Sequence, residues 1–350
     1  MIINAQITGI KYTPFLCEPL NICSDFETAL NEDAVCLLNI CGNLIAVSKW
    51  VSPKRTRSYP YARVCNTLNH YGKKATIIPF VKDEGADGDR DFIQWDTISL
   101  MSLLGVYVII AYYSSASKNT HYANKITAQK FDTQFIHNEI EKLLSYQSDA
   151  LHWNIDQINN IAIPANLSKY HYAKIQIDNK VKMHSPFGID KRIAVIQRDK
   201  NEFMNLSRHS AQAAQIREIN TIQPKENITD GIKAQINITN YLGGMYYLTC
   251  DEAKIDGNAI HIIEAKHTKN GILPSIDDIK DGLVKMILFS NLKNVLVNGI
   301  PFQPIPTLKL TSGTTQYRES ELSRTIMNEA KTNKFTLIMP NGDIVCPNTP

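Results

Sequence analysis

The residues best suited to chemistry lie in short segments that pair a carboxylate with a lysine two positions later. Glu-x-Lys occurs three times, as Glu252-Ala253-Lys254, Glu264-Ala265-Lys266 and Glu329-Ala330-Lys331, and Asp-x-Lys begins at Asp178 and Asp278. Residues i and i+2 share one face of a β-strand, but they point about 200° apart on a helix. Only a segment in a strand can therefore bring both groups to one site.

The second Glu-x-Lys segment has the strongest strand signal. Glu264 and Lys266 end the run Ile260-His261-Ile262-Ile263, whose β-branched residues are typical of a central strand. Glu329 with Lys331, and Asp278 with Lys280, fall in helical patterns. We expect strands over 245–255 and 259–266, joined by a turn at 256–258 into a hairpin.

The register of this hairpin decides which acid joins Glu264. A two-residue turn at Gly257-Asn258 places Asp251 directly opposite Glu264, and a turn at Asp256-Gly257 leaves Asp251 on the same face. A three-residue loop would select Glu252 instead. Facing side chains on neighbouring strands lie roughly 4.5–8 Å apart, which allows two carboxylates to share one divalent cation.

This arrangement suits phosphodiester hydrolysis. We expect Asp251 and Glu264 to bind Mg²⁺, with the Ala265 carbonyl oxygen as a further ligand, because a bound metal neutralises phosphate and acidifies water. Lys266 would orient that water or stabilise developing charge. Glu218, in the helix expected before the hairpin, could add a carboxylate. The alternative interpretation is a solvated hairpin face with a cross-strand ion pair.

Asp251 followed by Glu264-Ala265-Lys266, on a hairpin between helices, resembles the PD-(D/E)xK restriction-endonuclease-like nucleases. The resemblance covers roughly residues 205–300, and Cys250 stands where the family often has proline. The segment Glu264-Ala265-Lys266-His267 resembles type II restriction endonucleases more than it resembles the repair or tRNA-processing members of the family. The resemblance implies Mg²⁺-dependent cleavage of double-stranded DNA at a specific sequence, commonly by a homodimer, with a cognate DNA methyltransferase as functional partner.

A second region of interest is rich in positive charge. No Asp or Glu occurs between Ala34 and Lys82, a block that contains eight lysines and arginines. Aromatic residues between the cations favour nucleic-acid binding, although a soluble surface loop would have the same composition. The candidate DNA-binding residues are Lys49, Lys54, Arg55, Arg57, Tyr59, Tyr61, Arg63 and His267. The acidic stretch 83–91 lacks a calcium-loop pattern, so we expect a solvated turn.

The remaining pattern predicts a mixed α/β protein with a restriction-endonuclease-like core of a central mixed sheet flanked by helices. We expect an N-terminal α/β region over 1–160 and the nuclease core with a C-terminal extension over 161–350, divided near Ile161–Pro164. The predicted elements are a hairpin at 34–47, helices at 95–104, 132–158 (one or two), 205–222, 229–241, 275–292 and 319–331, and strands at 106–113, 295–297, 308–310 and 335–339. Residues 165–200 are expected to be strands and loops.

Composition limits the remaining possibilities. The 350 residues are 43% hydrophobic and 20% charged, which excludes a largely disordered chain. No apolar run is long enough to span a membrane, and the first residues do not form a secretory signal, so we expect a cytoplasmic protein. The seven cysteines include no Cys-x-x-Cys pair, which favours reduced thiols. Two alternative functions stay open: a structure-specific DNA repair or RNA-processing nuclease of the same fold, and a DNA-binding protein that does not cleave.

Overall fold

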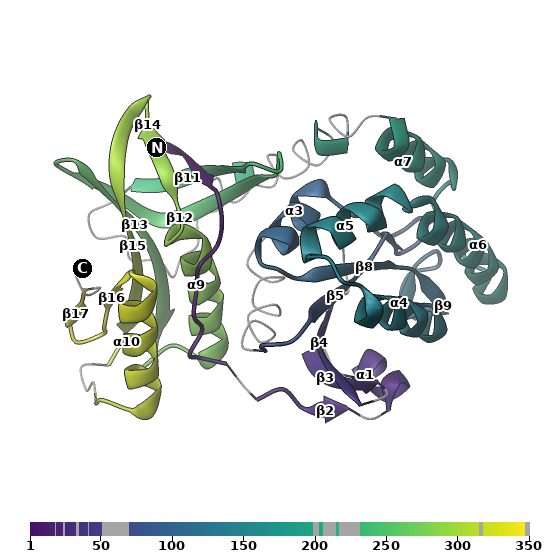
Figure 1. The fold of residues 1–350 in the computed structure, drawn as a ribbon, viewed down its shortest axis with the longest axis horizontal. Helices are drawn as coiled ribbons and strands as arrows, with labels where there is room; N and C mark the ends of the chain where they lie inside the picture. Colours follow the sequence, from purple (N-terminus) through teal and green to yellow (C-terminus); the bar gives the residue numbers. More distant parts are fainter. Residues whose placement is uncertain are drawn as a thin grey trace. The chain divides into compact units, whose positions relative to one another are not determined.

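The computed structural model shows a mixed α/β protein whose chain forms two compact units (Figure 1). It describes residues 1–17, 19–23, 25–32, 35–40, 42–50, 70–198, 203–205, 215–216, 232–314 and 318–346. The described residues between 19 and 205 form the N-terminal unit. Residues 1–17 join those from 215 onward in the C-terminal unit.

The N-terminal unit is built on one sheet with the strand order β2-β3-β4-β5-β8. The strands are β2 (Ile22–Cys23), β3 (Val35–Ile40), β4 (Asn43–Lys49), β5 (Lys74–Pro79) and β8 (Tyr107–Ala111). β3 and β4 form the predicted hairpin, with Ile40 opposite Asn43. β4, β5 and β8 run parallel. Parallel strands are covered on both faces, which explains why β5 and β8 are almost continuously apolar and buried.

Helices and two small hairpins surround this sheet. The helices are α1 (Phe26–Glu32), α3 (Trp95–Leu103), α4 (Thr133–Ser145), α5 (Ala150–Asn159), α6 (Ala162–Asn179) and α7 (Phe187–Arg198). The hairpins pair β6 (Val81–Asp83) with β7 (Arg90–Phe92) and β9 (Tyr113–Lys118) with β10 (Ile126–Phe131). The stretch 132–158 thus contains two helices, capped by Asp132 and Asp149, whose side chains accept from the N–H groups of Phe135 and His152.

Lys73 caps the C-terminus of α4 from a neighbouring segment. Its ammonium donates to the carbonyl oxygens of Leu143, Leu144 and Tyr146 at 2.5, 3.1 and 2.6 Å. The last carbonyls of a helix lack partners within the helix and carry partial negative charge, so a cation there is stabilising. Lys73, one of the cations in the acid-free block, therefore has a structural role.

We expect Lys73→Met to destabilise the N-terminal unit by about 1–2 kcal/mol, because three helix-terminal carbonyls lose their donor. This should lower the midpoint of thermal unfolding by roughly 2–8 °C. The exposed Lys118 provides the control, since Lys118→Met removes the same charge from the same unit and should leave the midpoint unchanged. An unchanged midpoint for Lys73→Met, together with weaker DNA binding, would contradict the structural role.

The segment 162–198 corrects the sequence prediction, because it forms helices α6 and α7 and not strands and loops. Pro164, which suggests a boundary, lies in the first turn of α6. Backbone N–H groups in the first turn have no partner within the helix, so a proline there costs no hydrogen bond. Tyr172 and Ile175 lie on the buried face of the same helix. The predicted boundary near 161–164 consequently falls inside the N-terminal unit, and the observed division lies close to residue 207.

The strands of the C-terminal unit form one sheet with the order β13-β12-β11-β1-β14-β15-β16-β17. They are β1 (Ile2–Ile7), β11 (Ile232–Asn240), β12 (Met245–Asp256), β13 (Ala259–Thr268), β14 (Lys293–Val297), β15 (Ile300–Ser312), β16 (Thr336–Ile338) and β17 (Ile344–Val345). β11, β12 and β13 form an antiparallel meander, and β13 also pairs in parallel with β15. The β13–β15 pairing closes the first six strands of this order into a ring.

Two helices pack on this sheet. α9 (Ile276–Phe289) follows β13 and contacts both β13 and β15, so the chain makes a crossover between two parallel strands (Figure 1). Ser275 begins α9 as its N-cap, since its hydroxyl accepts from the Asp278 N–H. α10 (Glu321–Asn333) contacts β16. The predictions for 245–255, 259–266, 275–292, 319–331 and 335–339 are confirmed to within a few residues.

Strand β11 corrects the predicted helix at 229–241. Ala234, Ile236 and Ile238 alternate with more exposed residues and are fully buried, which is the period of a strand. β11 lies between β1 and β12 and pairs with both. The predicted helix at 205–222 lies almost entirely outside the described residues.

Candidate active site

The hairpin of β12 and β13 places the first two candidate residues opposite each other. Glu252 pairs with Ile263 and Asp256 with Ala259, which is the register of a two-residue turn at Gly257-Asn258. Continued by one residue, this register puts Asp251 opposite Glu264. The Ala265 N–H donates to Asp251 Oδ2 at 2.8 Å and ties the two strands together at this point.

Glu264 is the buried centre of the cluster, with 2% of its surface exposed. Its Oε1 lies 3.2 Å from Lys266 Nζ, and its Oε2 lies 2.7 Å from Lys285 Nζ. Burial raises the pKa of Glu264; the Lys285 charge opposes this shift, and the neighbouring Asp251 carboxylate adds to it. The cluster therefore joins two mutually repelling carboxylates to two ammonium groups.

Helix α9 supplies the second wall of the cluster. Asp281 Oδ2 accepts from Lys266 Nζ at 2.6 Å. Burial alone would lower the pKa of Lys266, but Glu264 and Asp281 raise it overall, so the ammonium stays charged. Gly282 allows this close approach, because a Cβ there would lie 2.7 Å from Leu308 Cδ1 and 3.4 Å from the Lys266 stem.

Asp281 and Lys285 were not identified from the sequence. The sequence contains only a weak signal for them. They are two charged residues four positions apart, with a glycine directly after the first, in a helix whose other residues are mostly apolar and buried. Such spacing is common on exposed helices as well. Only the packing of α9 against β13 reveals that both side chains reach the cluster.

Two other candidates near the hairpin lie on the opposite face. Glu252 is buried, and its Oε2 lies 3.7 Å from Lys309 Nζ, so it does not join Glu264. His267 follows Lys266 on β13, and alternation turns its side chain away from Lys266. Its Nδ1 lies 3.0 Å from Thr311 Oγ1.

The third Glu-x-Lys segment has a structural role. Glu329 lies in α10, as expected, and is fully buried. Its carboxylate accepts from the Tyr12 hydroxyl at 2.6 Å and from the N–H groups of Phe15 and Leu16 at 2.9 and 2.8 Å. It therefore fastens the segment after β1 to α10.

The donor set around Asp251 fits a magnesium ion. Mg²⁺ is typically held by one or two carboxylates together with water and substrate oxygens. The N–H and C=O of a strand residue point to the same neighbouring strand, so the Ala265 carbonyl faces the side of Asp251 together with its N–H. Within the described ranges, no group of three or more His, Cys, Asp or Glu side chains converges as metal ligands. The candidate site thus consists of Asp251, Glu264 and the Ala265 carbonyl.

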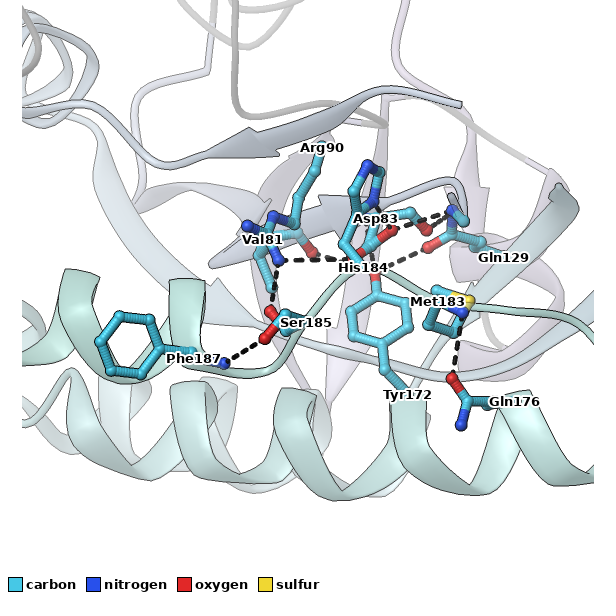
Figure 2. Close-up of polar contacts among 11 residues, drawn as sticks. Val81, Asp83, Arg90, Gln129, Tyr172, Gln176, Met183, His184, Ser185 and Phe187 are labelled. Atoms are coloured by element: carbon cyan, nitrogen blue, oxygen red, sulfur yellow. Dashed lines mark hydrogen bonds and ion pairs between the residues drawn. The ribbon is translucent and has the colours of Figure 1, made fainter. Parts of the chain in front are cut away.

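The acidic stretch 83–91 is engaged in internal contacts (Figure 2). Asp83 is buried and lies 2.8 Å from His184 Nδ1, and it accepts from the Gly85 N–H. The Tyr172 hydroxyl accepts from the Asp83 N–H at 3.0 Å and lies 2.8 Å from Gln129 Oε1. These contacts attach the connection between α6 and α7 to β6 through Asp83, whereas the turn at 86–88 is exposed at Ala86 and Asp87, as expected for a solvated turn.

The structure describes only part of the candidate DNA-binding set. Lys49 is buried and donates to the Leu30 carbonyl oxygen, which removes it as a surface contact for phosphate and corrects its assignment. Lys54, Arg55, Arg57, Tyr59, Tyr61 and Arg63 lie outside the described residues, and so does Glu218. The nucleic-acid interpretation of this block therefore stays a prediction.

Comparison with known proteins adds no assignment. No protein-family model, no curated protein and no solved structure matches this chain. Among the described residues, no helix combines the length and apolar character needed to cross a bilayer. The chemistry of the residues in the cluster is therefore the basis for assigning a function.

Proposed function

We propose that this protein is a Mg²⁺-dependent endonuclease that hydrolyses phosphodiester bonds in double-stranded DNA at a specific sequence, as a type II restriction endonuclease does. The observation that carries the proposal is the convergence of Asp251, Glu264 and Lys266 from two paired strands. The mixed sheet that carries these strands, with α9 packed against β13 and β15, also supports the proposal.

The side chains divide the chemistry between them. Asp251, Glu264 and the Ala265 carbonyl would hold the metal, which when bound neutralises the scissile phosphate and acidifies a water. Lys266 keeps its charge and would stabilise the oxyanion as the bond breaks. The side chains of Lys266 and Asp281 are 17% and 35% exposed, which leaves this edge of the cluster accessible to a DNA backbone.

The test is cleavage of a long, unmethylated DNA duplex by the purified protein with Mg²⁺ or with EDTA. A restriction endonuclease should give discrete fragments with 5′-phosphate ends in Mg²⁺ and none in EDTA. Cutting limited to junctions, free ends or RNA would favour a repair or RNA-processing nuclease. Duplex binding without cleavage in Mg²⁺ or Mn²⁺ would identify a non-cleaving DNA-binding protein and overturn the proposal.

The narrower expectations follow from this proposal. A homodimer would match the two-fold symmetry of a palindromic site, and sedimentation of the protein on DNA would detect it. A sequence-specific endonuclease would also need a DNA methyltransferase of the same specificity to protect the host. Methylation of the DNA substrate by that enzyme should abolish cleavage.

A further inference from the structure

The candidate metal site contains a buried negative charge that the protein must neutralise when no metal is bound. Asp251 and Glu264 carry like charges on opposed strands, and such pairs repel. Glu264 is also almost completely buried, so its ionised form requires a counter-charge close by. A chain that folds before it meets a divalent cation must supply this charge itself.

Lys285 is placed to supply it. Its ammonium lies 2.7 Å from Glu264 Oε2 and donates to the Thr249 carbonyl oxygen at 3.1 Å. It reaches the site from α9, so it bridges β12 and β13, the two strands that carry the carboxylates. Lys266, by contrast, makes its shortest contact with Asp281, at 2.6 Å, and lies farther from Glu264, at 3.2 Å.

We propose that the Lys285 ammonium is an internal stand-in for the divalent cation, which neutralises Glu264 in the metal-free protein and competes with Mg²⁺ for this carboxylate. The inference rests on the proposed function, since it requires the metal to bind at Asp251 and Glu264. Lys285 is then a positioning residue that keeps the empty site folded. A Mg²⁺ ion that binds would then replace the Lys285 ammonium as the positive charge next to Glu264. The two repelling carboxylates would already be held close together before the ion binds.

The test measures metal binding and stability separately from cleavage. In Lys285→Met, Mg²⁺ no longer competes with an ammonium, so calorimetric titration should give an affinity higher than that of wild type by about tenfold, equivalent to about 1.4 kcal/mol. The midpoint of thermal unfolding in EDTA should fall, and the increase produced by saturating Mg²⁺ should exceed that of wild type. Lys285→Arg, which keeps the charge, should stay close to wild type in both measurements.

Lys254→Met is the matched control, because it removes a lysine charge from an exposed position of the same hairpin and should change neither measurement. If Lys285→Met is unfolded in EDTA, recovery of cooperative unfolding in saturating Mg²⁺ supports the stand-in role, and failure to recover overturns it. Unchanged or weaker Mg²⁺ affinity in a folded Lys285→Met also overturns it.

Asp251→Asn separates this inference from the proposed function. If wild type binds Mg²⁺ and Asp251→Asn does not, the metal site stands whatever Lys285→Met shows. If wild type binds no divalent cation, the proposed metal-dependent function fails together with the inference.

Discussion

Replacement of Lys266 by methionine should lower the rate of DNA cleavage by about a hundredfold to a thousandfold while the protein stays folded. Removal of one preorganised group that stabilises transition-state charge costs about 10²–10³ in rate. Methionine keeps the apolar stem that packs against Gly282. Single-turnover cleavage at saturating Mg²⁺ measures the effect, and DNA binding in Ca²⁺ checks that the substrate still binds.

The chain offers a closely matched control for this substitution. Lys331 ends the same tripeptide, Glu-Ala-Lys, but it lies exposed on α10, away from Asp251 and Glu264. Lys331→Met should therefore cleave at the wild-type rate. Full activity of Lys266→Met would remove Lys266 from the mechanism, and equal losses in both variants would point to a general effect of the substitution.

The contrast between these tripeptides shows why the core of the cluster could be predicted from sequence. Strand periodicity placed Glu264 and Lys266 on one face, and the Gly257-Asn258 turn set the register that brings Asp251 opposite Glu264. Both are local rules that act over fewer than twenty residues. Helical periodicity likewise placed Glu329 in α10 and set it apart from Lys331.

The part of the cluster contributed by α9 could not be predicted in the same way. Asp281 and Lys285 reach Lys266 and Glu264 because α9 packs across β13 and β15, and a glycine at 282 permits the contact. This arrangement depends on tertiary packing between elements about twenty residues apart. Charged residues at this spacing would look the same on a solvated helix.

The incorrect fold predictions have specific causes. Helix signals over 229–241 predict a helix, but Ala234, Ile236 and Ile238 alternate with polar residues, and alternation indicates a strand. The proline at 164 suggests a boundary, but proline is compatible with the first turn of a helix. The pairing of β1 with β11 joins residues more than 200 positions apart, and no local pattern predicts it.

Glu264→Gln should lower the rate of DNA cleavage by at least about a thousandfold and should also weaken Mg²⁺ binding. The substitution keeps the size of the side chain and an oxygen that can accept from Lys285, but it removes the negative charge that a hard cation requires. The losses of cleavage and of Mg²⁺ affinity should appear together, because the same carboxylate is needed for metal binding and, through the metal, for cleavage. Calorimetric titration with Mg²⁺ and single-turnover cleavage measure them independently.

Glu329→Gln is the companion experiment, since Glu329 is equally buried and begins an identical tripeptide. Its carboxylate accepts three hydrogen bonds, and a glutamine amide would turn an NH₂ group toward one of the donors, Tyr12, Phe15 or Leu16. We expect a loss of about 2–4 kcal/mol in unfolding free energy, measured by urea denaturation, with Mg²⁺ affinity and cleavage rate unchanged in the folded protein. The two buried glutamates thus separate by outcome: Glu264→Gln should remove Mg²⁺ binding and cleavage, whereas Glu329→Gln should weaken the fold and leave both intact. A Glu264→Gln protein that still binds Mg²⁺ and cleaves would place the metal elsewhere.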